Sequence, residues 1–424
     1  MSKLALFVRY GVEVRVFLNE TTREKVRGAI LFHTVSDSSY LKEYSSEYEV
    51  ELIQVSNLEE EQNKWGSFFN SSRMARNRLA NQENYKHYTK ADNRRRISDY
   101  FKGNKITFNC LKFLFRNSYR NSVNEDLANK LSLNEVIEIW LSGYSSPVNL
   151  SVAVTATSMN CRTVCYINSW KDHFINNYVP PVFDEIRVWS TAMKEQYALT
   201  NEGFKDEQIV VFGNPRLSAL HNHMPIQSLE YYREKYKVSG GDIILYTAIN
   251  PKVYDDEPKV VKLILENMKY LLGDQAPCFL IKTNPMDSSP ERWDELKQFE
   301  NVAVIRSKWE WNLQEDFNLP SLASELEWFD LLHLCTCTMN VASTVTVESL
   351  VCGKAVINIE FDHTGKPKDL FQRYSNAPFY RFLLTRKDVV LAADVNQVCA
   401  AYVCERNMDA RDGLSSLIEL KGQR

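Results

Sequence analysis

Short apolar runs alternate with helix-like segments along most of this chain, and that alternation restricts the possible folds more than any other feature. In the first half, strands are predicted at residues 3–8, 29–33, 48–55, 136–141, 162–167, 186–189 and 209–212. Apolar residues at helical spacing predict helices at 147–159 and 192–199, each between two of the later strands. Parallel strands need crossovers of this kind. The first half therefore predicts a parallel sheet covered by helices on both faces.

The pattern starts again after a polar connector at residues 214–227. Strands are predicted at 243–247, 278–282, 302–305 and 355–359, and helices at 229–236 and 260–272. A chain of 424 residues is also too long for one typical hydrophobic core. We predict an α/β fold with two Rossmann-like doubly wound domains facing a cleft. The first domain is expected at 1–222 and the second at 223–400, with a helical tail at 401–424.

Composition and charge exclude several classes of protein. The net charge of −3 argues against nucleic-acid binding through overall positive charge. The nine cysteines form neither a disulfide framework nor paired zinc-ligand spacings, so we expect no metal and a reducing compartment. The N-terminal apolar run is too short for a signal peptide, and no stretch approaches the length of a membrane span. We expect a soluble cytoplasmic protein whose contact with the inner membrane, if any, is peripheral.

The segment 331–362 has the strongest ligand-binding pattern. Residues 329–334 are apolar, as expected of a buried strand or of the end of a helix leading to one. Small and hydroxylated residues at 338–344 follow, and the apolar spacing from 345 to 351 predicts a helix. A strand, a small-residue turn and a helix N-terminus present free N–H groups to a phosphate. An ordinary α/β unit with a capped helix fits the same pattern equally well.

Three residues of this predicted helix are candidates for nucleotide contacts. Ser343 or a near neighbour is the expected N-cap, and Thr344 follows it. Glu348 lies one turn further, where a carboxylate can accept hydrogen bonds from ribose hydroxyls. We therefore expect phosphate and ribose to bind at the start of this helix.

Polar residues also follow two other predicted strands of the second half. Lys282 and Asn284 come at the end of one strand, and Thr247 and Asn250 at the end of another. Ligands of doubly wound sheets bind at the carboxyl ends of the strands. Lys282 can neutralise a phosphate, and the polar groups can hydrogen-bond a base or ribose. The alternative is a pair of plain turns, since Asn-Pro is a common turn dipeptide.

Candidate catalytic groups come from the first half. Asp172 and His173 are adjacent in a polar loop that follows the strand predicted at 162–167, and either could act as a general acid or base. Glu13 follows the first strand and a glycine turn, where it could bind donor or acceptor. Equally, Glu13 is a solvated helix residue, and an isolated histidine is more often structural than catalytic.

The stretch 90–120 interleaves Arg and Lys with Tyr and Phe. Such a segment can dock an anionic lipid-linked acceptor at a membrane surface. It can also be an amphipathic helix with an ordinary charged face, which is the more frequent case.

Several motifs resemble GT-B glycosyltransferases of the bacterial surface-polysaccharide type, which make capsule and O-antigen. The segments INSWKDHF, DEIRVWSTAMKEQYA and IVVFGNPRL resemble the end of their first domain, and ASTVTVESLVCGKAVINIEFD resembles their phosphate and ribose segment. This resemblance covers most of residues 167–362 and assigns donor contacts to Ser343, Thr344 and Glu348. IKTNP is similar to the K-x-HP motif of transferases that use CMP-activated acidic sugars, with Asn284 replacing the histidine. CMP-, UDP- and GDP-linked donors therefore stay open.

The resemblance implies transfer of a sugar from a nucleotide sugar to a glycan or lipid-linked acceptor. Lys282 and the helix N-terminus would stabilise the leaving phosphate without a metal ion. A CDP-polyol phosphotransferase of the wall-polymer type would share this architecture, but it usually carries histidines at both phosphate motifs. A non-catalytic module that binds nucleotide sugars is the third hypothesis. No nucleic-acid partner is expected.

Overall fold

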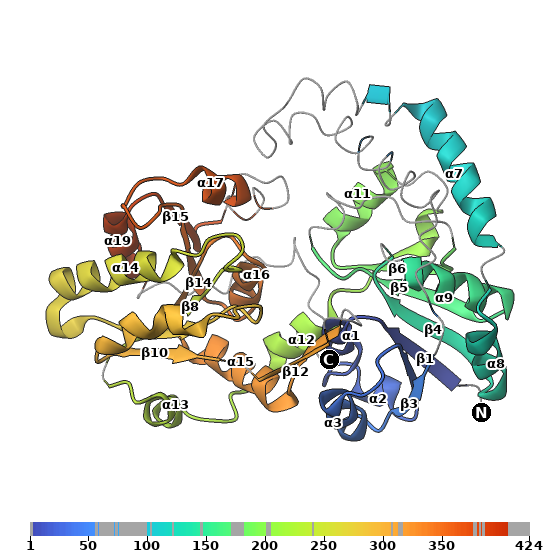
Figure 1. Cartoon of the computed structure of the whole chain (residues 1–424), viewed down its shortest axis with the longest axis horizontal. Coiled ribbons are helices and arrows are strands. Elements are labelled where there is room, and N and C mark those ends of the chain that lie inside the picture. The colour runs from blue at the N-terminus through green and yellow to red at the C-terminus, as the bar shows by residue number, and fades with distance from the viewer. Residues whose placement is uncertain are drawn as a thin grey trace. The chain divides into compact units, whose positions relative to one another are not determined.

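A computed structural model shows the fold (Figure 1). It describes residues 3–55, 58, 72, 75, 100–101, 104–120, 123–144, 147–170, 182–200, 205–239, 241–306, 308–312, 317–375, 380, 383 and 386–405. These residues form two compact units. The first unit comprises the described residues up to Ala219 together with Glu310–Ser321. The second unit comprises those of Leu220–Trp309 and those from Leu322 to Glu405.

The first unit is built on a parallel sheet with strand order β3-β2-β1-β4-β5-β6-β7. Its strands are β1 (Lys3–Val8), β2 (Ile30–His33), β3 (Glu51–Gln54), β4 (Val136–Ser142), β5 (Arg162–Tyr166), β6 (Glu185–Val188) and β7 (Ile209–Val211). Its helices are α1 (Gly11–Phe17), α2 (Arg23–Val26), α3 (Ser39–Glu47), α7 (Lys105–Arg120), α8 (Glu125–Leu133), α9 (Pro147–Ser158) and α11 (Thr191–Thr200). The helix α12 (Pro215–Asn222) crosses the boundary between the units.

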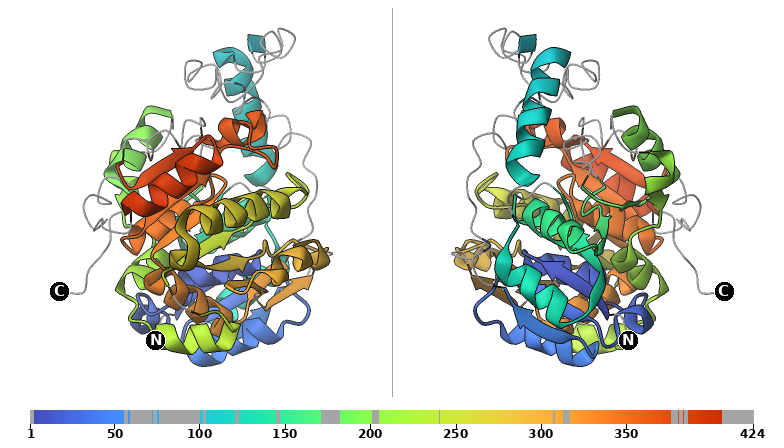
Figure 2. Two further views of the ribbon diagram at one scale, coloured as in Figure 1. Left: turned by 90° about the vertical axis from the view of Figure 1, so that its left-hand side faces the viewer. Right: turned by 90° about the vertical axis from the view of Figure 1, so that its right-hand side faces the viewer.

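The central strands of the first unit form because most of their side chains are apolar and buried on both faces. All four residues of β2 are buried, as are the last four of β1 and of β4. Helices α8 and α9 pack together, and α9 lies against β4 and β5. Figure 2 shows these helices in front of the sheet in its right-hand view. Such continuous burial is typical of a parallel sheet covered by helices.

A two-stranded ribbon encoded within the second half of the sequence completes the first unit. It consists of β11 (Trp309–Asn312) and β12 (Phe317–Pro320), and β12 packs against α1 and α3. A Cβ on Gly11 would lie 2.2 Å from the carbonyl oxygen of Asn318, so only glycine allows this approach. The Glu310 carboxylate accepts hydrogen bonds from the backbone N–H groups of Ser39 at 3.0 Å and Tyr40 at 3.1 Å. Glu310 therefore caps the N-terminus of α3 from a remote part of the chain.

The second unit has its own parallel sheet with strand order β10-β9-β8-β13-β14-β15. Its strands are β8 (Ile243–Thr247), β9 (Cys278–Lys282), β10 (Val302–Ile305), β13 (Cys337–Asn340), β14 (Ala355–Ile359) and β15 (Val389–Ala392). Its helices are α13 (Leu229–Tyr236), α14 (Glu257–Leu272), α15 (Leu322–Leu334), α16 (Thr344–Val351), α17 (Asp369–Ser375) and α19 (Val395–Glu405). Short 3-10 turns lie at Asp206–Gln208 in the first unit and at Gly273–Gln275 and Pro290–Gln298 in the second.

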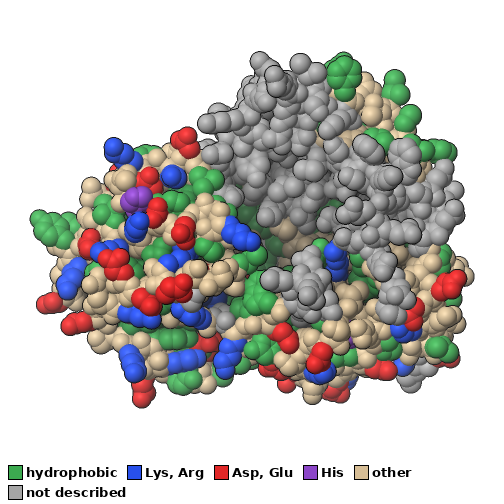
Figure 3. All heavy atoms as spheres, in the orientation of Figure 1, with side chains coloured by type: hydrophobic (Ala, Val, Ile, Leu, Met, Phe, Trp, Pro, Cys, Tyr) green, Lys and Arg blue, Asp and Glu red, His purple; other side chains and the backbone are tan. Residues whose placement is uncertain are grey.

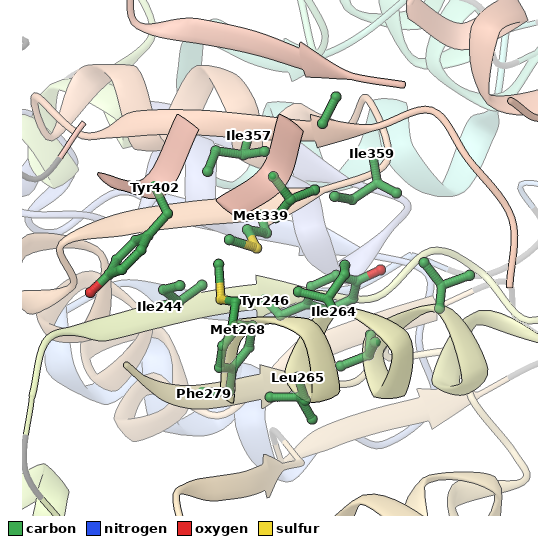
Figure 4. Close-up of a cluster of buried hydrophobic side chains, with 14 of the residues drawn as sticks. Ile244, Tyr246, Ile264, Leu265, Met268, Phe279, Met339, Ile357, Ile359 and Tyr402 are labelled. Carbon is green, nitrogen blue, oxygen red and sulfur yellow. The ribbon is translucent and has the colours of Figure 1, made fainter. Parts of the chain in front are cut away.

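The two faces of this second sheet differ in character. One face packs on α14 and α19 through an apolar cluster that includes Tyr246, Ile264, Met339, Ile357 and Tyr402 (Figure 4). Successive side chains of a strand point to opposite faces, so the residues between these strand positions face α15 and α16. The face toward α15 and α16 carries the polar residues of the candidate site.

The structure confirms the predicted α/β fold class with two parallel-sheet units. Residues 329–334 belong to the end of α15, and the strand before α16 is instead 337–340, part of the stretch expected to be a turn. The expected boundary at 222/223 compares with an observed division at 219/220, and 310–321 joins the first unit. The expected tail at 401–424 begins inside α19, and its remainder beyond Glu405 lies outside the described residues.

Candidate functional site

A row of polar residues crosses the carboxyl end of the second sheet. Lys282 on β9 is in register with Thr247 on β8, Thr247 with Asn340 on β13, and Asn340 with Asn358 on β14. Residues in register lie on the same face of a sheet, here the face covered by α15 and α16. This is the edge at which doubly wound sheets bind ligands.

Asn340 links this row to the start of α16. Its Oδ1 accepts hydrogen bonds from the Ser343 backbone N–H at 3.1 Å and from the Thr346 hydroxyl at 3.2 Å. The side chain is completely buried, yet no partner for its Nδ2 lies within hydrogen-bond distance in the described part of the chain. A buried amide that donates no hydrogen bond is destabilising. Asn340 therefore keeps two unused N–H donors beside the turn that begins α16.

Asn358 repeats the arrangement on the neighbouring strand. Its Oδ1 accepts a hydrogen bond from the Tyr380 hydroxyl at 2.9 Å, and it is also completely buried. Among described residues, neither its Nδ2 nor the buried hydroxyl of Thr247 has a hydrogen-bond partner. Three neighbouring positions of the row thus have unsatisfied polar atoms.

The turn before α16 is tight and the helix is capped as predicted. Ser343 is the N-cap, and its hydroxyl accepts a hydrogen bond from the Val345 backbone N–H at 3.2 Å. Ala342 adopts a φ of +33°, a region that residues with a Cβ rarely occupy. Thr344, the first helical residue, is exposed. The helix lies against β13 and β14 (Figure 1). Its positive N-terminal end is linked to the row by the hydrogen bond from the Ser343 N–H to Asn340. This arrangement can hold an anion.

Glu348 and Lys282 are connected through Trp328 on α15. The Trp328 indole N–H donates a 2.7 Å hydrogen bond to a carboxylate oxygen of Glu348, which is buried in the second turn of α16. The Lys282 ammonium lies 4.6 Å from the centre of the Trp328 ring. A cation over an aromatic face is attracted by the ring electrons. Three elements, β9, α15 and α16, thereby hold one cation and one carboxylate near the same sheet edge.

The predicted amide residues mainly organise their own loops. Asn284 accepts a hydrogen bond from the Met286 N–H at 2.9 Å, and Asn250 accepts one from the Lys252 N–H at 2.9 Å. Asn284 also donates to the Ala248 carbonyl at 3.4 Å, so the loops after β8 and β9 are joined. These are turn contacts of the kind that Asn side chains commonly make.

A buried carboxyl supports the loop after β8. Glu257, at the start of α14, is completely buried and accepts hydrogen bonds from the Ile249 N–H at 3.0 Å and the Tyr246 hydroxyl at 2.9 Å. Burial raises the pKa of Glu257 to about 8, from an ordinary value of 4.5. The carboxyl is therefore mainly protonated at neutral pH and acts as an internal anchor for the loop that carries Asn250.

The first unit has a second polar cluster at the carboxyl end of its own sheet. Glu13 on α1 accepts hydrogen bonds from the backbone N–H groups of Arg9 at 2.8 Å and Tyr10 at 3.1 Å, and Asn168 Nδ2 lies 3.4 Å from its other oxygen. Asn168 also hydrogen-bonds Ser142, the last residue of β4. Burial raises the pKa of Glu13 to about 7. This carboxyl can exchange a proton near neutral pH.

Five of the site residues predicted in the second half lie on neighbouring elements. Two of those predicted in the first half are outside the described residues. Lys282, Thr247, Ser343, Thr344 and Glu348 all lie on elements that meet at one sheet edge. Asp172 and His173 lie outside the described residues. The sequence analysis missed Asn340, Asn358 and Trp328. The only local sign of a half-polar strand was the segment CTMN, in which Thr338 and Asn340 alternate with apolar residues.

Two features are absent from the described residues. In the portions of the chain that the structure covers, no group of three or more His, Cys, Asp and Glu side chains is placed to hold a metal ion. Over the same portions, no helix has the length and apolar character needed to cross a membrane.

Comparisons with known proteins identify the fold. No protein-family profile matches the chain, and no curated protein sequence matches it. Among solved structures, UDP-GlcNAc 2-epimerase from Methanocaldococcus jannaschii is similar, with a TM-score of 0.55, 10% identity, and coverage of 98% of this chain and 96% of that one. The Neisseria meningitidis UDP-GlcNAc 2-epimerase bound to UDP-GlcNAc has a TM-score of 0.55, 11% identity, and coverage of 98% and 97%.

A co-structure of S. aureus MnaA with UDP is also similar, with a TM-score of 0.53, 11% identity, and coverage of 99% of this chain and 91% of that one. At such low identity, these likenesses establish a shared fold. It is the GT-B-like fold of two Rossmann-like units, and it extends over nearly the whole of both chains. The narrower likeness to capsule and O-antigen transferases is not confirmed.

Proposed function

We propose that this chain is a glycosyltransferase that moves a sugar from a nucleotide-activated donor to a glycan or lipid-linked acceptor in surface-polysaccharide synthesis. The second unit would bind the donor nucleotide, and the first unit would bind the acceptor. The fold it shares with proteins whose structures contain UDP-GlcNAc or UDP supports a nucleotide sugar as substrate.

The observation that carries this proposal is the unused Asn340 amide at the start of α16. The Asn340 carbonyl oxygen is already bonded to Ser343, so its Nδ2 hydrogens remain available beside the positive end of a capped helix. A phosphate oxygen would accept hydrogen bonds from such donors and would interact favourably with the helix dipole. A diphosphate bound there would satisfy polar groups that are otherwise buried without partners.

Each remaining group has a role in this scheme. Lys282 would contribute positive charge toward the leaving phosphate from its position over the Trp328 ring. Glu348, held by the Trp328 indole, would accept hydrogen bonds from the ribose hydroxyls. Thr247 has a buried hydroxyl available for the same nucleotide. Fixed charge and dipole of this kind stabilise a developing phosphate charge without reorganisation, so the reaction would need no divalent metal.

The acceptor hydroxyl would lose its proton to a group of the first unit. The candidates are Asp172, His173 and Glu13. Glu13 has a pKa of about 7, which suits a general base. It also contacts Asn168, the residue from which the chain continues toward Asp172 and His173. Glu13 lies on α1 after β1, whereas Asp172 and His173 follow β5 in the sequence.

Epimerisation of the sugar is the second candidate function. The solved structures with TM-scores of 0.55 include enzymes named as UDP-GlcNAc 2-epimerases, and this likeness is what favours it. Both functions require the nucleotide at α16. They differ in what happens to the sugar, because a transferase breaks the bond to the phosphate and needs an acceptor, whereas an epimerase returns an intact nucleotide sugar.

The experiment is a thermal-shift series with UDP, GDP, CMP, CDP and UDP-GlcNAc. A nucleotide at about 100 times its Kd should stabilise the protein by roughly 2.7 kcal/mol. Ser343→Trp should abolish the shift because the indole would block the helix N-terminus. Ser228→Trp is the matched control, since Ser228 also caps a helix of the second unit, α13.

The proposal fails if no nucleotide raises the melting temperature or if Ser343→Trp leaves the shift intact. Incubation of the wild-type protein with the shifting nucleotide sugar alone separates the two functions. Inversion at C2 without an acceptor, read from the coupling between H1 and H2 by NMR, would favour the epimerase.

A further inference from the structure

Helix α7 exposes large apolar side chains on the first unit. Ile106 is 74% exposed and Phe113 is 64% exposed, and the exposed Cys110 lies between them at helical spacing. Just before the helix, Tyr100 and Phe101 are 64% and 67% exposed, and their rings meet edge to face at 6.1 Å. Surface apolar side chains normally occur singly, so a cluster of this kind indicates an interaction surface.

The apolar stripe belongs to a helix whose other side is already packed. Phe108 is 3% exposed, and α7 contacts α9. The views in Figures 1 and 2 agree that α7 runs along the edge of the first unit. Burial of Phe108 fixes the helix on the unit, so the stripe at Ile106 and Phe113 faces away from the core.

The charge of this region is positive although that of the whole chain is −3. In sequence, α7 contains Lys105, Lys112, Arg116 and Arg120 and no acidic residue, and Lys102 precedes it. No aspartate or glutamate occurs from residue 100 to 124. In Figure 3, the described surface over α7 shows exposed hydrophobic side chains.

We propose that α7 docks the first unit on an anionic lipid bilayer, with Ile106 and Phe113 inserted among the lipids and the exposed Lys105 at the headgroups. Apolar insertion and attraction to acidic lipids are the two contributions by which such helices bind a membrane surface. Anionic lipid fits better than a protein partner because the helix offers a stripe and a uniform charge but no carboxylate for reciprocal ion pairs. The inference goes beyond the proposed function and does not depend on a bound nucleotide.

The test is flotation of the full chain with vesicles of phosphatidylcholine alone or mixed with phosphatidylglycerol. We expect binding only to the mixed vesicles, with less binding at high salt because salt screens the attraction. The double variant Ile106→Glu, Phe113→Glu should lower the partition coefficient by roughly tenfold or more. Lys105→Gln should lower it about fivefold, since each cation near an anionic surface contributes about that factor. Leu133→Glu, at a residue 82% exposed on α8, is the matched control and should bind normally.

Three results would overturn the proposal: no binding to mixed vesicles, equal binding to both vesicle types, or undiminished binding by the double variant. A change of mass in solution, reversed by the double variant and without vesicle binding, would assign the stripe to a second copy of the chain and also overturn it. The nucleotide-induced thermal shift of the double variant is measured in parallel. It should be normal, so a failure of membrane docking is distinguishable from a failure of the nucleotide site.

Discussion

The Trp328 indole N–H donates a hydrogen bond of 2.7 Å to the Glu348 carboxylate, although 20 positions separate the two residues. The same indole ring lies beneath the Lys282 ammonium. Trp328 therefore positions both charged groups of the proposed donor site, one through its N–H and the other through its ring.

Trp328→Phe should weaken nucleotide binding and lower stability. Phenylalanine keeps an aromatic face for Lys282 but removes the indole N–H that donates to the buried Glu348 carboxylate, and loss of such a bond typically costs about 1–3 kcal/mol. Urea denaturation measures that loss, and titration measures nucleotide affinity. Trp293→Phe is the control, because the Trp293 indole donates a similar 2.9 Å bond to the Asp287 carboxylate. It should lose similar stability but keep its affinity; equal affinity losses in both variants would contradict the assignment.

Gly11→Ala should destabilise the first unit. Alanine in a helix normally stabilises by about 0.5–1 kcal/mol relative to glycine. Here, its Cβ would meet the Asn318 backbone at 2.2 Å, and overpacking of this kind costs roughly 1–3 kcal/mol. We expect a lower urea midpoint for the first unit. An unchanged or higher midpoint would show that the β11–β12 ribbon does not approach α1 this closely.

Stability should fall with rising pH through the two buried glutamates. The pKa of each is higher in the folded state than its ordinary 4.5, so the folded state binds the proton more tightly. The free energy of unfolding contributed by Glu257 should decline from about pH 4.5 to about 8, and that from Glu13 to about pH 7. The maximal slope is roughly 1.4 kcal/mol per pH unit for each group.

Glu257→Gln and Glu13→Gln isolate these contributions, because glutamine does not titrate. The measurement is urea denaturation from pH 5 to 9, in which each variant is subtracted from wild type. The difference should level off near pH 8 for Glu257 and near pH 7 for Glu13. A difference that is flat over the whole range would refute the raised pKa values.

Turnover should survive chelation once donor and acceptor are known. The sequence has no Asp-x-Asp segment to hold a metal–diphosphate, whereas Lys282 and the N-terminus of α16 can stabilise a leaving phosphate. The measurement is product formation with and without EDTA. Loss of activity on chelation, restored by Mg²⁺ or Mn²⁺, would assign the phosphate charge to a metal instead.

Asp172→Asn and His173→Ala should slow turnover while changing nucleotide affinity little. A positioned acid or base is typically worth about 10²–10⁴-fold in rate. Steady-state kinetics and nucleotide titration, carried out on the same preparations, separate the two effects. Near-normal turnover in both variants would leave Glu13 as the remaining candidate, to be tested with Glu13→Gln.

The sequence predicted features that depend on local signals. Ser343 is an N-cap because of its position before a helical pattern, and Lys282 and Thr247 end apolar runs, so each was identifiable from its neighbours. Asn340 was missed because β13 is a short strand in which polar residues alternate with apolar ones. Trp328 was missed because only the folded chain brings α15 beside Glu348.

The β11–β12 ribbon was missed for a different reason. Nothing near residues 309–320 in the sequence indicates that they pack against α1 and α3, because their partners lie about 270 positions earlier, as for Glu310 and Tyr40. The periodicity of apolar residues predicts individual helices and strands. Contacts between residues so far apart in the sequence depend on the whole fold.

The Glu310 contact also determines when the first unit can finish folding during synthesis. Its sheet strands are complete once β7 has emerged, yet α1 and α3 stay uncovered until residues 310–321 leave the ribosome. At about 5–20 residues per second, the intervening stretch of roughly 100 residues imposes a delay of about 5–20 s. Throughout that interval the nascent protein exposes a site for β12 on α1. The first unit therefore cannot finish folding until part of the second half of the chain has been synthesised.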